Sequence, residues 1–206
     1  MVTIGVAIPS IPPRGAMLRN AVNSVLIQQR QADRLCVVVD AERRGVTAAR
    51  NDAWRGLGEV DYVAFLDDDD VMYSNHLRLL ERAAIESGAD VTYPWFDVKD
   101  PWNRKLPSFL NVGDEPAENR PFDQASVDEL ASRSNFIPVT TLVRRIALER
   151  VGGFPRPGTA RWPHEANEDW GLWRSMLDDG AIFYHLPART WQWRWHENHT
   201  MGRPVW

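Results

Sequence analysis

The stretch Tyr62-Val63-Ala64-Phe65-Leu66-Asp67-Asp68-Asp69-Asp70 joins a short apolar run directly to four consecutive aspartates. A continuous apolar run of this length is typical of a strand inside a parallel sheet. Four adjacent carboxylates repel one another at neutral pH, so a fold keeps them at a strand end where a cation or a phosphate-bound metal compensates their charge. Ligands of open α/β sheets collect at this end of the strands. We therefore place the functional site at the aspartates, and a solvated acidic turn is the alternative.

Apolar runs and helical periodicity alternate through the first half of the chain. The second of these runs, Leu35 to Val39, is nearly continuous, as in strands that are covered on both faces. The pattern predicts strands at 3–8, 35–39, 62–66 and 90–95, and helices at 18–26, 46–54 and from a Ser74 cap through Ala84. This order predicts an α/β fold with a mostly parallel central sheet flanked by helices.

The second half is less regular. Residues 94–121 contain five prolines and little periodicity, which predicts a long irregular excursion near the site. Order is expected to resume at 136–143, and 154–167 reads as another loop. Further elements are predicted as a short helix at 146–151 closed by Gly152-Gly153, a helix around Trp170 and Trp173 that ends before Gly180, and two strands at 181–186 and 190–195.

Composition limits the possible classes of protein. With 206 residues, 44% of them hydrophobic, the chain is long enough for one sizeable core and hardly for two. Its longest apolar runs are too short to span a bilayer, and the first residues lack the basic segment of a signal peptide, so a cytoplasmic protein is expected. The net charge of −4 and the scattered basic residues make nucleic acid an unlikely partner. The single cysteine, Cys36, is expected to be a buried structural thiol.

Four separated segments carry a family resemblance. In chain order they are Val6-Ala7-Ile8-Pro9-Ser10, then Gly45-Val46-Thr47-Ala48-Ala49-Arg50-Asn51 leading into the aspartates, then Val143 to Phe154, and finally Glu168-Asp169-Trp170 with Trp193-Arg194-Trp195-His196 following. Together they resemble the family 2 glycosyltransferases of GT-A fold, which are inverting and metal-dependent. The resemblance spans nearly the whole chain. It implies a single, minimal soluble GT-A domain over 1–206, with a nucleotide-sugar-binding half at 1–95 and an acceptor-side half at 96–206.

The resemblance implies a nucleoside-diphosphate sugar as donor and Mn²⁺ or Mg²⁺ as cofactor. Such cations take oxygen ligands and make the diphosphate a better leaving group. Asp69 is expected to bind the metal directly, with Asp70 as second choice, and Asp67 to contact the ribose or a metal-bound water. Asp68 is expected to point away from the metal and is grouped with the nucleotide contacts. His196 is a candidate third metal or diphosphate ligand, and His199 is its rival.

The remaining nucleotide contacts follow the same motifs. Pro9 and Ser10 end the first strand, Asp40 ends the second and matches the position that reads the base, and Arg50 matches the arginine that reaches the nucleotide. A turn cap is the alternative role for Asp40, and a surface salt bridge is the alternative for Arg50. The chain departs from the family pattern in the Ala41-Glu42-Arg43-Arg44 segment after Asp40 and in Ser10, which replaces a threonine.

Asp169 matches the position of the general base that removes the acceptor's proton. Acidic residues at a helix N-terminus also complement the helix dipole, so Glu168-Asp169 could instead be a structural pair. The base and sugar of the donor are open, and so is the acceptor, which is a glycan, a protein or a small molecule.

Three other classes compete with this interpretation. A phosphatase of the haloacid dehalogenase type would use Asp67 as nucleophile and Asp69 as acid/base, but it needs a lysine, and the chain has only Lys99 and Lys105. A nucleotidyltransferase would need a glycine-rich basic loop after Ile8, which is missing. The third is a non-catalytic nucleotide-sugar or carbohydrate-binding relative. It is favoured by the tryptophans near the C-terminus, whose flat faces can hold a sugar ring: Trp162, Trp170, Trp173, Trp191, Trp193 and Trp195.

Overall fold

The computed structural model of the chain describes residues 2–100, 102–106, 121–132, 134–155 and 168–196. Its centre is one sheet with the strand order β2-β1-β3-β7-β5-β8-β4, and β6 pairs with β5 beside this path. The strands are β1 (Ile4–Ser10), β2 (Arg34–Val39), β3 (Tyr62–Phe65), β4 (Val71–Met72), β5 (Val91–Lys99), β6 (Lys105–Leu106), β7 (Leu142–Arg144) and β8 (Phe183–Arg194).

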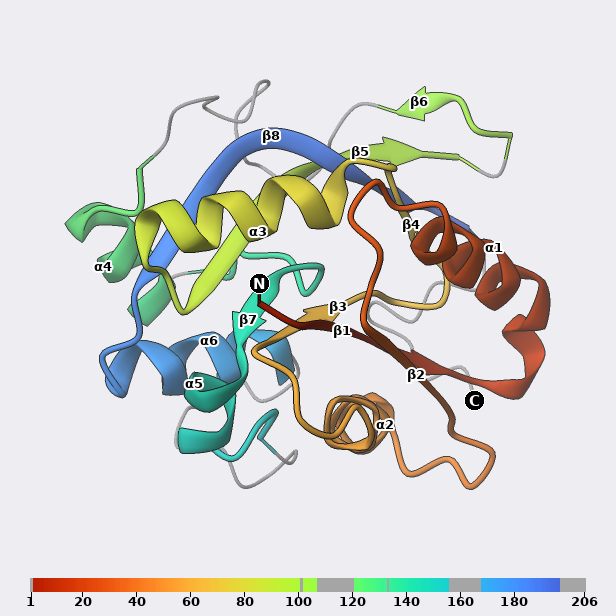
Figure 1. The fold of residues 1–206 in the computed structure, drawn as a ribbon, viewed down its shortest axis with the longest axis horizontal. Helices are drawn as coiled ribbons and strands as arrows, with labels where there is room; N and C mark the ends of the chain where they lie inside the picture. Colours follow the sequence, from red (N-terminus) through yellow and green to blue (C-terminus); the bar gives the residue numbers. More distant parts are fainter. Residues whose placement is uncertain (1, 101, 107–120, 133, 156–167, 197–206) are drawn as a thin grey trace.

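Helices cover both faces of this sheet (Figure 1). They are the 3-10 helix η1 (Pro12–Arg14) and the α-helices α1 (Gly15–Leu26), α2 (Val46–Gly56), α3 (His76–Ser87), α4 (Gln124–Ser132), α5 (Arg145–Arg150) and α6 (Glu168–Asp178). In the part of the chain that the structure describes, no helix is both long enough and apolar enough to cross a membrane.

The sheet is mostly parallel, as predicted. The strands β2, β1 and β3 pair in parallel, and β5 pairs in parallel with β8. The short strand β7 lies antiparallel between β3 and β5, so those two strands point the same way without touching. Four of the predicted strands therefore end at the same edge of the sheet, where the aspartates follow β3.

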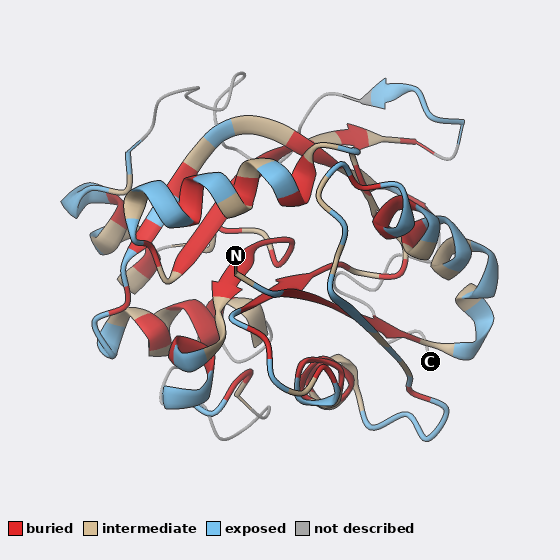
Figure 2. Ribbon diagram, in the orientation of Figure 1, coloured by how far each residue is buried: buried red, intermediate tan, exposed pale blue. Residues whose placement is uncertain are grey.

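Two apolar cores lie on the two faces of the sheet. Strands β1 and β3 are buried along their whole length (Figure 2) because alternate side chains enter opposite cores. On one face Val6 and Ala64 pack with α1 and α3, and on the other Ala7 and Phe65 pack with α2, α5 and α6. The core residues hold the ends of β1 and β3 in place, and these ends carry the site.

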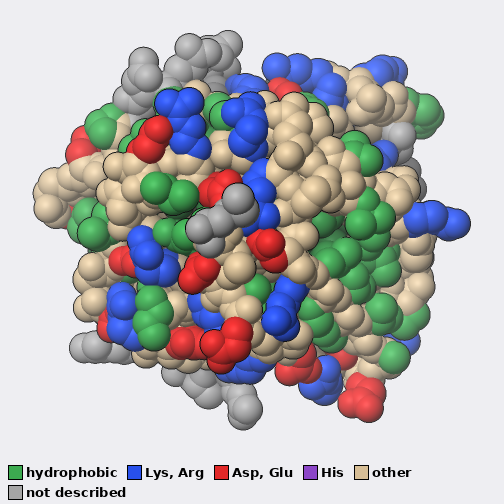
Figure 3. Space-filling model, in the orientation of Figure 1, with side chains coloured by type: hydrophobic (Ala, Val, Ile, Leu, Met, Phe, Trp, Pro, Cys, Tyr) green, Lys and Arg blue, Asp and Glu red, His purple; other side chains and the backbone are tan. Residues whose placement is uncertain are grey.

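The expectation that the second strand is covered on both faces is wrong. Strand β2 is the last strand of the sheet, and Leu35, Val37 and Val39 are 36%, 36% and 47% exposed. Only Cys36 and Val38, on the other face, pack against a core. Figure 3 shows hydrophobic side chains gathered on the surface over α1 and β2. An apolar run predicts a strand, but it does not tell whether a helix covers each face.

Several boundaries differ from the predictions. The two strands expected near the C-terminus are one strand, β8, and two residues including Pro187 lie in a bulge between Leu186 and Arg189, where proline is tolerated. Strand β5 continues to Lys99, into the stretch expected to be irregular. The cap of α3 is Asn75 and not Ser74. The sequence pattern did not predict β4, β6 or α4.

Gly153 supports the link between α2 and the loop after α5. Its φ is +85°, and a Cβ added to it would lie 2.4 Å from Oδ1 of Asn51. The Asn51 amide accepts the backbone N–H of Phe154 at 3.0 Å and donates to the Phe154 carbonyl at 2.8 Å. The Asn51 side chain therefore needs the space that glycine leaves.

We predict that Gly153→Ala lowers the free energy of unfolding by roughly 2 to 3 kcal/mol, because strained backbone and steric overlap add. Gly152→Ala is the matched control, since its φ is +77° but nothing lies within 4 Å of the added Cβ. Its loss should be close to the backbone strain alone, about 1 kcal/mol. Urea unfolding of both variants measures the difference, and equal losses would contradict this account of Asn51.

Candidate active site at the strand ends

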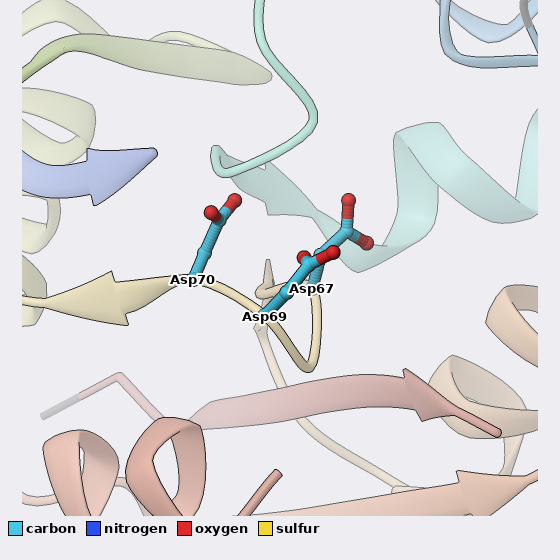
Figure 4. Close-up of side chains that lie close together, drawn as sticks. All are labelled: Asp67, Asp69 and Asp70. Carbon is cyan, nitrogen blue, oxygen red and sulfur yellow. The ribbon is translucent and has the colours of Figure 1, made fainter. Parts of the chain in front are cut away.

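The four aspartates form a tight turn between β3 and β4. The turn begins where the backbone N–H of Leu66 bonds to the carbonyl of Ala7 on β1, and it closes with the N–H of Asp70 bonding to the carbonyl of Asp67 at 3.2 Å. The side chains of Asp67, Asp69 and Asp70 converge, with one oxygen of each within 4.8 Å of the others (Figure 4). These three carboxylates form an acidic triad.

Asp68 lies outside the acidic triad. Its buried carboxylate accepts a hydrogen bond from the Ser10 hydroxyl at 2.7 Å and another from a terminal nitrogen of Arg14 at 2.9 Å. Ser10 is the last residue of β1, so this bond ties the turn to the neighbouring strand. Burial raises the pKa of Asp68, and the bonds from Ser10 and Arg14 oppose that rise.

Arg14 is a site residue that the sequence reasoning missed. The same terminal nitrogen that bonds to Asp68 also donates to Oδ2 of Asp69 at 2.7 Å. Burial alone would lower the pKa of Arg14, but the negative charges of Asp69 and Asp68 outweigh it and raise the pKa. A basic residue between Pro-Pro and the first helix was the available signal, and only the fold shows that it faces the aspartates.

The end of β8 completes this side of the site. The backbone N–H of Arg194 donates to Oδ1 of Asp70 at 3.0 Å, and Nε2 of His196 lies 3.1 Å from Oδ2 of Asp69. The structure thus brings the predicted ligand His196 to the acidic triad, and His199 lies outside the described residues. Burial, followed by the charges of Asp69 and Asp67, raises the pKa of Asp70 well above its usual range.

Arg50 on α2 joins the acidic triad to the start of α6. One terminal nitrogen bonds to both oxygens of Asp67 at 2.7 and 2.9 Å, and the other bonds to Glu168. The guanidinium carbon lies 5.4 Å from the centre of the Phe154 ring, and the side chain is buried. Arg50 is therefore a buried ionic bridge, and the alternative of a weak surface salt bridge does not describe it.

Asp169 lies in the first turn of α6, directly after Glu168. One oxygen accepts the backbone N–H of Trp170 at 2.7 Å, which satisfies a free donor of the helix end. Burial, followed by the charge of Glu168, raises the pKa of Asp169 to about 6, although the positive charge of Arg50 opposes the rise. A carboxylate with this pKa is ionised at neutral pH and accepts a proton more readily than an ordinary aspartate.

Asp40 lies at the end of β2, and its buried carboxylate accepts backbone N–H groups from Arg44 at 3.0 Å and Gly45 at 2.7 Å. These bonds shape the turn before α2, as the turn-cap alternative describes. Pro9 is buried in β1 and pairs with Val38 of β2. The pairing of β1 with β3 ends at Ala7, so the N–H that proline lacks is not needed for a hydrogen bond to β3. The structure thus places Pro9 and Asp40 close to the strand ends, while the base-reading role of Asp40 stays a prediction.

The tryptophans divide between core and surface. Trp170, Trp173 and Trp191 are buried and belong to the packed interior, whereas Trp195 is 41% exposed beside His196. Trp162 lies outside the described residues. Three of the six tryptophans near the C-terminus therefore belong to the core.

The acidic triad fits a divalent cation. It offers three carboxylate oxygens, the ligand type that Mg²⁺ and Mn²⁺ prefer, in one small group. The raised pKa values of Asp67 and Asp70, caused first by burial, show that the negative charges are costly without further positive charge.

An α/β sheet whose parallel strands end at clustered carboxylates is the arrangement of a GT-A glycosyltransferase. Residues 15–152, more than half of the chain, match the family described as Glycosyl transferase family 2. The chain belongs to this family.

Solved structures of S. aureus TarS have a similar fold. Residues 1–349 of S. aureus TarS in complex with UDP-GlcNAc match with a TM-score of 0.66 and 18% identity, over 97% of this chain and 60% of that one. Another structure of the same TarS segment matches with a TM-score of 0.64 and 16% identity, over 92% of this chain and 60% of that one. The complex of this segment with UDP matches with a TM-score of 0.60 and 16% identity, over 94% of this chain and 60% of that one. This chain thus spans about 60% of the length of these TarS structures. No curated protein matches the chain in sequence.

Proposed function

We propose that this protein is an inverting glycosyltransferase that moves a sugar from a nucleoside-diphosphate sugar to an acceptor. The observation that carries this proposal is the Arg50 bridge, because it holds the acidic triad and the Glu168-Asp169 pair in one site. A transferase needs a group that binds the donor diphosphate and a base that faces the acceptor. The two ends of the bridge supply candidates for both.

The donor end is built from the strand ends. We assign nucleotide contacts to Pro9, Ser10, Asp40, Arg50, Asp67 and Asp68, and metal ligands to Asp69, Asp67, Asp70 and His196. A bound Mn²⁺ or Mg²⁺ would neutralise the charge that develops on the departing diphosphate. Ser10 and Arg14 hold the backbone of the aspartate turn in place through Asp68, and Arg50 orients Asp67.

Asp169 is the proposed general base. Its carboxylate takes the proton of the acceptor, whose nucleophilic atom forms a bond to the anomeric carbon as the bond between that carbon and the diphosphate oxygen breaks. Attack opposite the leaving group inverts the anomeric configuration. Glu168 is bound to Arg50, so its carboxylate is less suited than Asp169 to accept the proton.

The choice of donor is supported by the comparisons. The family consists of glycosyl transferases, and TarS, the protein of similar fold, is described in complex with UDP-GlcNAc and with UDP. We therefore propose a nucleoside diphosphate as the leaving group, with the uracil, guanine or thymine base left open.

The phosphatase alternative fits the structure less well. Both oxygens of Asp67, its would-be nucleophile, are bonded to Arg50. Lys105 pairs with Asp97 on β5, at 3.1 Å, and not with the aspartate turn. The motif also follows β3, whereas this type of phosphatase carries it on the first strand.

The class of reaction is tested by incubating the protein and Mn²⁺ with UDP-, GDP- and dTDP-sugars and, separately, with a generic phosphomonoester. We expect the nucleoside diphosphate to be released from one donor class, by slow hydrolysis in the absence of the acceptor, and the phosphomonoester to stay intact. Chromatography of the nucleotides and a phosphate assay measure both. Metal-dependent phosphate release that Asp67→Asn abolishes would favour the phosphatase instead.

A further inference from the structure

The aspartate turn carries its own positive charges. Arg50 bonds to Asp67, Arg14 bonds to Asp68 and Asp69, and a backbone N–H bonds to Asp70. Each aspartate therefore has a hydrogen-bond donor that belongs to the chain itself. Four carboxylates at a strand end can persist without a metal when such donors offset their repulsion.

Arg14 is placed for this role by a short rigid segment. It ends η1, which begins with Pro12 and Pro13, and its backbone N–H bonds to the carbonyl of Ile11 at 3.0 Å. The Arg14 side chain is 10% exposed, and its terminal nitrogen lies between the carboxylates of Asp68 and Asp69. The backbone of this segment is constrained, whereas the long side chain has rotatable bonds through which its guanidinium could leave Asp69.

The contact with Asp69 conflicts with metal binding. Oδ2 of Asp69 accepts a hydrogen bond from Arg14 at 2.7 Å and lies 3.1 Å from Nε2 of His196, so two side chains of the protein already contact this oxygen. A divalent cation on Asp69 would lie within a few ångströms of the guanidinium, and two positive charges at that distance repel each other strongly in a partly buried site. Arg14 and the cation therefore act against each other at one carboxylate.

We propose that Arg14 is an internal counter-ion that competes with the divalent cation for Asp69. In the metal-free protein Arg14 stabilises the aspartate turn, and cation binding weakens or breaks its bond to Asp69 while the bond to Asp68 keeps it nearby. The consequence is a metal site that is kept weak until the donor diphosphate adds negative charge. This inference rests on the proposed metal site and concerns a residue outside the family motifs.

The test is calorimetric titration of Mn²⁺ into nucleotide-free protein, comparing wild type with Arg14→Gln. We expect Arg14→Gln to bind Mn²⁺ at least about tenfold more tightly, because a positive charge within a few ångströms of the cation is removed. Arg30→Gln is the matched control. Arg30 is also a mostly buried arginine, 14% exposed, and it pairs with Asp33 at 2.8 Å and Glu81 at 3.1 Å. Its Mn²⁺ affinity should stay within about twofold of wild type.

A second variant keeps the test independent of whether Arg14→Gln folds. Should Arg14→Gln fail to fold without metal, Arg14→Lys carries the test. A lysine keeps the positive charge but lacks the planar guanidinium, which contacts Asp68 and Asp69 together. Arg14→Lys should therefore bind Mn²⁺ about threefold more tightly than wild type.

Equal or weaker Mn²⁺ binding by Arg14→Gln, the same gain in Arg30→Gln, or no measurable Mn²⁺ binding by any of the proteins would overturn the proposal for Arg14. Because no nucleotide is present, these titrations are independent of donor recognition. Failure of the proposed function would instead appear as a lack of nucleoside-diphosphate binding, which is measured separately.

Discussion

Replacing Asp169 by asparagine should lower turnover by roughly 10²-fold or more while donor affinity stays within a few-fold. Asparagine keeps the size of the side chain and can still accept the N–H of Trp170, but it cannot take a proton from the acceptor. The fold and the Arg50 bridge do not depend on the Asp169 carboxylate, since Arg50 bonds to Asp67 and Glu168. The loss should therefore appear in kcat at saturating donor.

Glu168→Gln is the internal control for this experiment. It removes an adjacent carboxylate of similar position but weakens only the ion pair with Arg50, so the loss of turnover should be clearly smaller. Equal small losses in both variants would mean that the pair merely complements the helix dipole. A larger loss in Glu168→Gln than in Asp169→Asn would mean that Glu168, and not Asp169, is the general base.

The pH dependence of activity is a second test of the role of Asp169. Burial raises the pKa of Asp169 to about 6, and the base works only in its ionised form. Activity should therefore be full above this pKa and fall about tenfold per pH unit below it. The residual activity of Asp169→Asn should not show this fall at acidic pH. If the fall is unchanged in the variant, it is caused by the protonation of another group.

Replacing Asp69 by asparagine should remove the metal-dependent part of nucleoside-diphosphate binding. At a ligand concentration of about 100 times its Kd, binding stabilises the native state by about 2.7 kcal/mol, which for a domain of this size raises Tm by roughly 5 to 10 °C. We expect wild type to show this shift with the nucleotide and Mn²⁺ together and Asp69→Asn to show little of it. The metal-free variant should stay folded, because removing one of several crowded carboxylates relieves repulsion.

Asp68→Asn is the neighbouring control for Asp69. Asp68 faces Ser10 and Arg14 and lies outside the acidic triad, so Asp68→Asn should weaken nucleotide binding, as an assigned nucleotide contact, but keep its dependence on Mn²⁺. A full metal-dependent shift in Asp69→Asn, or nucleotide binding by Asp68→Asn that no longer depends on Mn²⁺, would show that the ligands are wrongly assigned.

The sequence predicted the strands that carry the site because short apolar runs and helical periodicity report local geometry. It did not predict what depends on neighbours distant in sequence. Strand β7 is three residues long and enters the sheet antiparallel between β3 and β5, and nothing in Leu142-Val143-Arg144 specifies that pairing. The exposure of Val37 and Val39 likewise follows from the position of β2 at the sheet edge.

The candidate site shows the same division. Asp67, Asp69 and Asp70 were found because they are adjacent in the sequence. The structure places His196 beside them, although His196 and Asp69 are 127 residues apart in the chain. Arg14 was missed because a single arginine before a helix has no periodic or motif signal. Only the packing of η1 against the aspartate turn shows its role.

The central claim is that the strand ends bind a nucleoside diphosphate together with a divalent cation. It is tested most directly by calorimetric titration of UDP, GDP and dTDP into the wild-type protein, first with Mn²⁺ and then with the metal removed by EDTA. We expect one of the three to bind with Mn²⁺ and to lose at least about tenfold in affinity, or about 1.4 kcal/mol, in EDTA. Binding of none of them, or equal binding with and without metal, would contradict the account.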